Sequence, residues 1–138
     1  NEPDGISGNE DCGQMSAWYI LSSMGFYSVT LASNKYIIGA PLFKKASINL
    51  ENGKVFTIAA DSVSEKNKYI KSVRLNGKRH PYSYLDHGDI IAGGSLVFEM
   101  TDKPTSWGTE NENIPVTEIK DHIIVSAPFI AKGDIAFK

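Results

Sequence analysis

The hydrophobic pattern of the chain is helical up to about residue 26. Met15, Trp18 and Leu21 recur at three-residue intervals, which is the spacing of one face of an α-helix. Gly25 follows the last periodic position and is a natural helix stop. The pattern therefore predicts a helix over residues 12–26.

The remaining faces of this predicted helix are also apolar. Ala17, Tyr19, Ile20 and Met24 occupy the positions between the periodic residues. A helix that is hydrophobic nearly all round is usually buried on most of its sides. We therefore expect an inner element that lies between layers or domains, and that leaves an adhesive apolar surface where no cover is present.

Downstream of residue 26 the pattern changes to short strands joined by turns. Apolar residues alternate on both sides of Asn52-Gly53 and again around Asn76-Gly77, and Asn-Gly is the strongest short-range hairpin signal. The segment 88–101 has two apolar runs divided by Gly93-Gly94, which we interpret as strands with a tight connection. The segment 121–138 predicts one or two further strands, and Pro128 limits one of them to an edge or an end.

These elements predict a mainly β fold. About seven to nine short strands with one N-terminal helix are typical of an antiparallel β-sandwich. The stretch 101–115 is polar and rich in turn formers, which indicates a long loop or linker. We divide the chain into residues 1–27 (acidic motif and buried helix), residues 28–108 (a small antiparallel β-sandwich domain) and residues 109–138 (linker and terminal strands that lead toward a further β-domain).

The composition is that of a soluble globular domain. The 138 residues are 41% hydrophobic and 22% charged, which argues against disordered and collagen-like classes. The net charge is -2 and basic residues are scattered among acidic ones, so no nucleic-acid partner is indicated. The longest apolar stretch, 15–27, is interrupted by serines and glycine and is shorter than the roughly 20 residues that span a bilayer.

The single cysteine and the chain ends add two expectations. Cys12 excludes an internal disulfide, and without an identified base we expect a semi-buried structural thiol. The sequence starts at Asn1 without a signal peptide and stops within an alternating pattern at 134–138. We expect both ends to be cuts through a larger protein.

Three potential oxygen donors, Asn9, Glu10 and Asp11, stand just ahead of the predicted helix. A side-chain oxygen there binds the free N–H groups and benefits from the positive end of the helix dipole, so capping by Asp11 or Asn9 is the simplest interpretation. The same setting suits a general base that activates water, or an oxygen ligand for a hard cation such as Ca²⁺. Gly8 and Gly13 flank the donors and permit close approach of a ligand. The residues alone leave these alternatives open.

Other candidate chemistry is weaker. The spacing of the acidic residues does not match an EF-hand, so a calcium site here would need several segments. His80, His87 and His122 fit no HxxxH or HExxH pattern, and we expect surface or turn positions. The glycine-rich segment 88–95 lacks the spacing of a phosphate-binding loop. The aromatic residues could either stack on sugar rings or pack in the core. We expect core packing for most of the following: Trp18, Tyr19, Phe26, Tyr27 and Tyr36.

Two strings resemble a known family. GNEDCGQMSAWYILSSMGFYSV (8–29), followed by YIIGAPLFKKASINLENGKVFTI (36–58), is similar to the C-terminal part of the bacterial α-mannosidases of glycoside hydrolase family 92, usually described as α-1,2-mannosidases. The resemblance covers residues 4–108. The pattern G-[ND]-[ED]-D-x-G-Q-x-S-A-W-Y in the first string is longer than a generic helix cap, and the IGAPLFKKA segment (38–46) resembles the family in what we expect to be a structural role.

This resemblance implies an exo-acting, calcium-dependent, inverting hydrolase with an N-terminal β-sandwich domain and an (α/α)6 barrel. The present chain would match the last inner helix of that barrel and the small β-domain after it. The resemblance implies that Asp11 is the general base and that Asn9 beside it orients the water or the sugar. Glu10 would either face the site or cap the helix.

The same resemblance places the rest of the machinery outside this chain. The catalytic acid, a glutamate, and most Ca²⁺ ligands would lie in barrel segments, so this chain alone is expected to be inactive. The implied partners are mannose-containing glycans and the rest of the parent chain, and the implied location is the periplasm or cell surface of a bacterium. The alternatives are a carbohydrate-binding β-sandwich module and a purely structural β-domain.

Overall fold

The computed structural model describes residues 5, 8–30 and 33–116. In this part of the chain a 3-10 turn, η1 (Asp11–Gly13), leads into helix α1 (Gln14–Met24), and a short helix α2 (His87–Ile91) and a 3-10 turn η2 (Asn111–Asn113) occur later. The strands are β1 (Phe26–Tyr27), β2 (Lys35–Ile38), β3 (Lys45–Asn49), β4 (Val55–Ala59), β5 (Tyr69–Leu75), β6 (Lys78–Arg79), β7 (Tyr84–Asp86) and β8 (Gly94–Thr101). The predicted mainly β fold with an N-terminal helix is confirmed.

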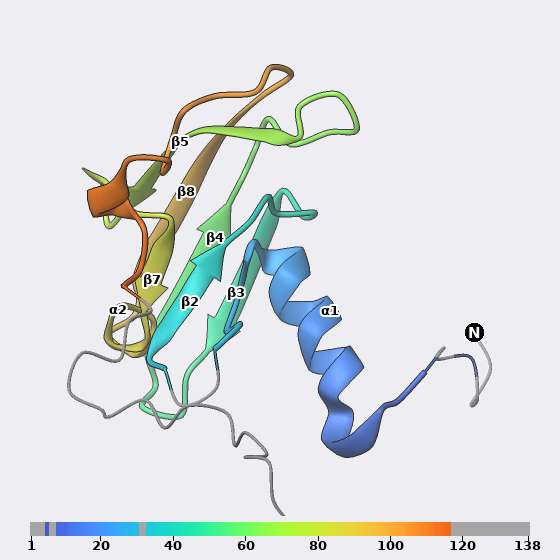
Figure 1. Ribbon diagram of the computed structural model, residues 1–138. Coiled ribbons are helices and arrows are strands. Elements are labelled where there is room, and N and C mark those ends of the chain that lie inside the picture. The colour runs from blue at the N-terminus through green and yellow to red at the C-terminus, as the bar shows by residue number, and fades with distance from the viewer. Residues whose placement is uncertain (1–4, 6–7, 31–32, 117–138) are drawn as a thin grey trace, which may run out of the picture.

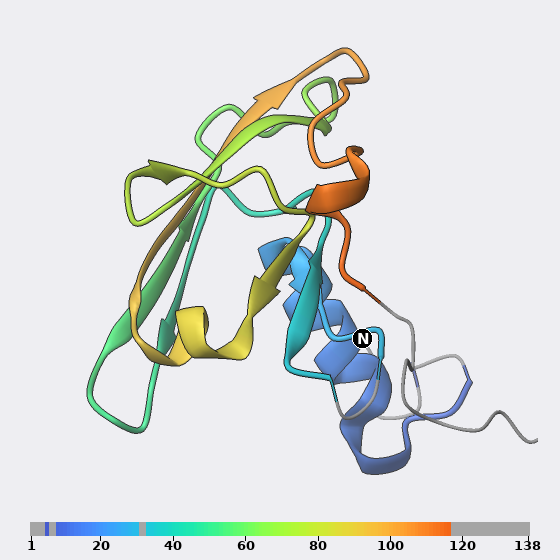
Figure 2. The same ribbon diagram turned by 60° about the vertical axis from the view of Figure 1, so that its left-hand side comes forward.

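The strands form two sheets, which Figures 1 and 2 show as two layers. One sheet has the order β1-β2-β7 and the other the order β3-β4-β8-β5-β6. Most neighbours pair antiparallel, as predicted, but β4 and β8 are parallel, with Phe56 opposite Gly94 and Ala59 opposite Val97. β8 lies between β4 and β5 in this sheet, and the chain reaches it only after β7 of the other sheet.

The hydrophobic core lies between the two sheets. On β8, Leu96, Phe98 and Met100 are buried while Val97 and Glu99 are exposed, which is the period of two expected for a strand with one face in the core. The buried apolar residues come from both sheets, and they include Phe26, Ile38, Phe56, Ile58, Val73, Leu85, Leu96, Phe98 and Met100. This shared core is what makes the two sheets a sandwich.

Both predicted hairpins are present. Asn52-Gly53 joins β3 to β4, where the N–H of Gly53 donates to the carbonyl of Leu50 at 2.9 Å. Asn76-Gly77 joins β5 to β6 with φ of 50° and 79°. Positive φ at both central residues is the mark of the type I′ turn that Asn-Gly favours.

The segment 88–101 differs from its prediction, because its first apolar run is helical. The carboxylate of Asp89 accepts a hydrogen bond from the N–H of Asp86 at 3.4 Å, which is one arm of a capping box at the start of α2. The helix ends at Ile91, and Gly93 just beyond it has a φ of 75° and an N–H that donates to the carbonyl of Ile90 at 3.0 Å. Only the second run forms a strand, β8.

The N-terminal helix is shorter than predicted. Cys12 and Gly13 have φ of 56° and 74°, and left-handed residues cannot continue a right-handed helix. Regular helix therefore begins at Gln14, and Gly25, with φ of 96°, ends it as predicted. The exposed position of Cys12 also contradicts the expected semi-buried thiol, because its backbone lies in this protruding turn.

The IGAPLFKKA segment ties the end of α1 to the sandwich. The N–H of Gly39 donates to the carbonyl of Gly25 and the N–H of Leu42 to that of Ser23, both at 2.9 Å. A Cβ at Gly25 would lie 3.1 Å from both Pro41 Cβ and Phe98 Cζ. These contacts support the structural role expected for this segment.

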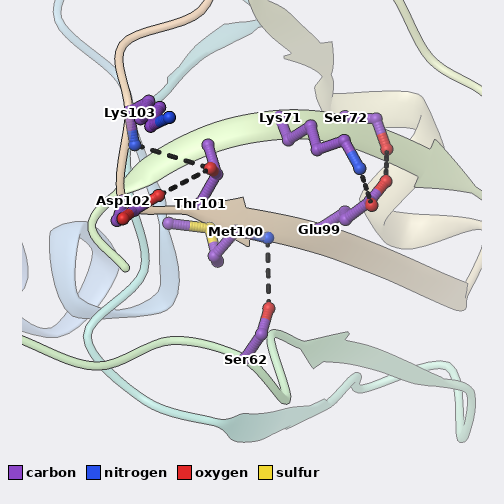
Figure 3. A network of polar contacts seen from close by, with 8 residues as sticks. All are labelled: Ser62, Lys71, Ser72, Glu99, Met100, Thr101, Asp102 and Lys103. Atoms are coloured by element: carbon purple, nitrogen blue, oxygen red, sulfur yellow. Dashed lines mark hydrogen bonds and ion pairs between the residues drawn. The ribbon is translucent and has the colours of Figure 1, made fainter. Parts of the chain in front are cut away.

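Polar contacts reinforce β5 and β8 on the outer face of the large sheet (Figure 3). The Nζ of Lys71 lies 2.6 Å from Glu99 Oε1, and the hydroxyl of Ser72 donates to Glu99 Oε2 at 2.8 Å. These two hydrogen bonds lower the pKa of the Glu99 carboxyl, and the one from Lys71 has the larger effect. At the next residue of β8, the N–H of Met100 donates to the hydroxyl of Ser62 at 3.2 Å.

The predicted loop 101–115 contains no strand after Thr101, but it is packed against the sandwich. The indole N–H of Trp107 donates to the carbonyl of His80 at 3.1 Å, and Asn113 is only 8% exposed. The strands predicted for 121–138, with Pro128 and His122, lie outside the described residues. The division of the chain into three parts remains a prediction.

Candidate active site

The acidic motif forms a compact hydrogen-bonded turn ahead of α1. The side-chain oxygen of Asn9 accepts a hydrogen bond from the N–H of Asp11 at 2.6 Å. The amide nitrogen of the same side chain donates to Asp11 Oδ2 at 3.0 Å. Asn9 therefore holds both the backbone and the carboxylate of Asp11, which fixes the direction in which that carboxylate points.

The N-cap position of α1 is Gly13, and the side chain that caps the first turn is that of Glu10, so the predicted cap by Asp11 or Asn9 is absent among the described residues. Both carboxylate oxygens of Glu10 lie 3.2 Å from the N–H of Ser16, in the first turn of the helix. The left-handed turn at Cys12 and Gly13 separates Asp11 from the helix proper, so that Glu10 is the carboxylate that reaches the free N–H groups. The structure thus gives Glu10 the capping function that its sequence position left open.

Asp11 itself is exposed. Its Oδ2 is held by Asn9, whereas no hydrogen bond from the described part of the chain reaches its Oδ1. A carboxylate with one oxygen positioned and the other open can accept a proton from a bound water. The capping and catalytic interpretations of the motif are therefore compatible, because they fall on different residues.

The helix after the motif exposes a continuous apolar surface. Trp18, Tyr19 and Ile20 are 46%, 55% and 56% exposed, and Trp18 and Tyr19 line a shallow pocket with Met15 and Ser16. Only the opposite side of α1 packs on the core, through Leu21 and Met24. Core packing is thus confirmed for Phe26 and Tyr36, whose rings meet edge to face at 5.7 Å, but it is wrong for Trp18 and Tyr19 in this chain.

The two described histidines have structural contacts. His87 is exposed as expected and stacks on Tyr36, with 6.0 Å between the ring centroids. His80 directly follows β6, in line with the expected turn or strand-end position, but it is only 8% exposed and so is not at the surface, and the Trp107 indole bonds to its carbonyl. Its Nε2 lies 2.8 Å from the carbonyl of Tyr84.

Residues 5, 8–30 and 33–116 contain neither a metal-binding cluster nor a membrane-spanning helix. No group of three or more His, Cys, Asp or Glu side chains in this part could hold a metal ion. Neither of the two described α-helices has the length and apolar character needed to cross a membrane.

One concave surface was not predicted from the sequence. A pocket of about 260 Å³ lies beside Trp107, between β5, β6 and the loop that follows β8, and its walls include Arg79 and Glu110. The available signal was a tryptophan in an otherwise polar loop, which the sequence pattern indicated only as a linker.

Residues 1–102 match the model of the glycosyl hydrolase family 92 catalytic domain. An uncharacterized secreted glycosidase of Arthroderma benhamiae is 31% identical over 114 residues, which are 80% of this chain and 15% of that protein. Among solved structures, a family GH92 alpha-mannosidase of Bacteroides thetaiotaomicron is 44% identical with a TM-score of 0.77 over 84% of this chain and 16% of its own.

A family GH92 inverting mannosidase of the same organism is 40% identical, with a TM-score of 0.71 over 77% of this chain and 14% of its own. The chain thus spans only a small part of the relatives that it matches. The family match covers the acidic motif, α1 and nearly all of the two-sheet sandwich. On this sequence and structural similarity, the chain belongs to glycoside hydrolase family 92.

Proposed function

We propose that this chain is the C-terminal part of the catalytic domain of an exo-acting α-mannosidase, and that it supplies the general base of an inverting reaction. The observation that carries the proposal is the Asn9–Asp11 hydrogen-bonded pair at the start of α1, in a chain of family 92. Family membership gives the reaction class, and the pair gives a carboxylate held in place for it.

Inversion requires two carboxyl groups on opposite faces of the sugar. One protonates the leaving oxygen, and the other removes a proton from water, with a separation of roughly 6.5–9.5 Å that leaves room for the water. Asp11 is the base in this proposal. Its open Oδ1 accepts the proton as the water oxygen bonds to the anomeric carbon and the glycosidic bond breaks, and Asn9 keeps Oδ2 in place.

The remaining parts of the reaction are proposed to come from the rest of the parent protein. The catalytic acid is a glutamate that would be contributed by the barrel, and this chain alone would be inactive because it holds half of the pair. Ca²⁺ does not fit the described residues as a complete site, since the oxygens of Asn9 and Glu10 are engaged within the motif. Its ligands are proposed to lie mostly outside this chain.

The substrate and location are finer proposals. We propose α-1,2-linked mannose in glycans as the substrate. One relative of this chain is described as an inverting mannosidase, which supports the reaction type. We also propose export to the periplasm or cell surface of a bacterium, and a relative described as a secreted glycosidase supports export.

The reaction is tested with the full-length parent enzyme and α-1,2-mannobiose, by recording proton NMR spectra of the released sugar at early times. The expected result is hydrolysis with β-mannose as the first product, because water attacks the face opposite to the leaving oxygen. Initial release of α-mannose would refute the inverting mechanism, and absence of hydrolysis of any α-mannoside would refute the mannosidase proposal.

A further inference from the structure

The pocket beside Trp107 has the features of a sugar-binding site. Its volume of about 260 Å³ is close to the lower end of the range of small-molecule sites. We propose that this pocket binds one neutral hexose unit of a mannose glycan, as a second site separate from the acidic motif. The mannose identity of that unit rests on the proposed function, whereas the pocket and its chemistry do not.

The walls of the pocket are held in place before any ligand binds. The hydroxyl of Thr105 donates to the carbonyl of Ile70 on β5 at 2.5 Å, and the Trp107 indole N–H donates to the carbonyl of His80. The carbonyl of Asn113 accepts two hydrogen bonds from Ser83, from its N–H at 2.8 Å and its hydroxyl at 3.0 Å. A loop fixed at these points loses little conformational entropy on binding.

The side chains that line the pocket match the surface of a sugar. A pyranose presents C–H groups on its faces and hydroxyl groups around its rim, so it needs an apolar platform beside polar groups. Trp107 is half-buried, packs against the core and lines the pocket, and the proposal assigns the platform to its indole ring. The Arg79 guanidinium only donates hydrogen bonds, and an ionised Glu110 carboxylate only accepts them. Together they can bind both the oxygens and the O–H groups of neighbouring hydroxyls.

The charges in the pocket favour a neutral ligand over an anion. Lys71 also lines the pocket, but its Nζ is paired with Glu99 at 2.6 Å (Figure 3). The remaining charges of the lining, the positive charge of Arg79 and the negative charge of Glu110, then sum to zero. An anionic ligand would meet the Glu110 carboxylate without an excess of positive charge to offset the repulsion.

The pocket does not belong to the site at the acidic motif. In both Figure 1 and Figure 2 the loop after β8 and η2 lie well apart from η1 and the start of α1. The two sites also use different elements, because the pocket is built from β5, β6 and the loop after β8. A glycan held at this pocket would thus anchor a branched substrate to the enzyme while a chain end is hydrolysed elsewhere.

The test uses the full-length parent enzyme in native gel electrophoresis, with and without soluble α-mannan in the gel. Arg79→Ala and Glu110→Gln each remove hydrogen bonds to the sugar, and we expect about tenfold weaker retention by mannan. Lys78→Ala is the matched control, because Lys78 is an exposed cation on the same strand that does not line the pocket, and its retention should equal that of the wild type. Thermal unfolding confirms that each variant is folded.

Several results would overturn the proposal. Wild-type retention in both pocket variants would show that mannan is not bound there, and so would equal loss of retention in Lys78→Ala. Release of the wild type from mannan by inorganic phosphate would indicate an anion site. If the wild type fails to hydrolyse mannobiose but the two pocket variants show the expected loss of retention, the pocket stands and the proposed function fails.

Discussion

At the scale of single residues, the acidic motif separates two functions that look alike in sequence. Asn9, Glu10 and Asp11 all carry oxygens that could cap a helix, and their sequence positions favoured Asn9 or Asp11. The left-handed φ of 56° at Cys12 changes which carboxylate reaches the helix. A non-glycine residue rarely adopts this conformation, so its effect on the cap could not be predicted from sequence.

Removal of the cap should destabilise the chain without affecting the Asn9–Asp11 pair. Glu10→Ala deletes the acceptor for the Ser16 N–H, and we expect a loss of about 0.5–2 kcal/mol in the free energy of unfolding. Urea unfolding followed by circular dichroism measures it. Glu51→Ala, at an exposed position of the β3–β4 turn, is the control, and equal stability of the two variants would show that Glu10 is not a cap.

The ion pair between Lys35 on β2 and Asp86, its partner on β7, should make stability depend on pH. The hydrogen bond of Lys35 Nζ to Asp86 at 2.9 Å raises the pKa of Lys35, and the ammonium also lies 4.0 Å from the ring centroid of Tyr84. Because the folded-state pKa is raised, this stabilisation is complete at neutral pH and is lost as the pH rises beyond the ordinary value of 10.5.

Lys35→Met is therefore expected to cost about 0.5–1 kcal/mol at pH 7, a small value because both side chains are partly exposed. The difference from the wild type should shrink at pH values above 10.5. Unfolding curves at a series of pH values measure it, and a difference that stays constant or grows in alkali would contradict the account.

At the scale of elements, the sequence predicted those turns and helix ends that depend only on neighbouring residues. The Asn-Gly hairpins and the glycine stop of α1 are present because each depends on residues within one turn. The segment 88–91 formed a helix although it was interpreted as a strand, since a short apolar run is compatible with either structure. Asp86 and Asp89, which favour a helix start there, are the residues whose signal could have corrected the interpretation.

The junction between α1 and the sandwich should be sensitive to one methyl group. Gly25→Ala introduces strain at a φ of 96° and places Cβ 3.1 Å from Pro41 and Phe98, so we expect about 2–4 kcal/mol of destabilisation. Gly77→Ala is the matched control, because its φ is 79° but nothing lies within 4 Å of the added Cβ. Denaturant titration of both variants compares them, and an equal cost would show that α1 is not tightly packed at this point.

The exposed face of α1 should make the isolated chain associate with itself. Trp18, Tyr19 and Ile20 together form an apolar surface of the kind that mediates contacts. Ile20→Lys is expected to shift the chain toward the monomer in sedimentation velocity experiments. Val116→Lys, at a 71% exposed position that is not part of α1, should have no such effect. Association that is unchanged by Ile20→Lys would contradict the proposed self-association through α1.

At the scale of the whole molecule, the two-layer fold class could be predicted but its topology could not. The alternation of apolar residues on β8 requires a buried face, whichever strand lies beside it. The parallel pairing of β8 with β4 depends on contacts between residues 56–59 and 94–97, and no local pattern encodes such distant pairing. The pocket beside Trp107 was missed for the same reason, since Arg79 and the loop residues Trp107 and Glu110 come together only in the folded chain.

The whole molecule also explains why the candidate site is exposed. The structural match to an alpha-mannosidase of its family covers 84% of this chain but only 16% of that enzyme. The open carboxylate of Asp11 and the apolar face of α1 lie on neighbouring parts of the same N-terminal segment. We infer that both are surfaces that the rest of the parent enzyme covers.

The central claim is that Asp11 is the general base, and the most direct measurement is the turnover of α-1,2-mannobiose by the full-length parent enzyme with Asp11→Asn. Loss of the proton acceptor should lower kcat by roughly 10²–10⁴-fold, while Asp61→Asn, the same substitution at an exposed turn after β4, should leave kcat at the wild-type value. Near wild-type turnover of Asp11→Asn in a folded enzyme would contradict the assignment.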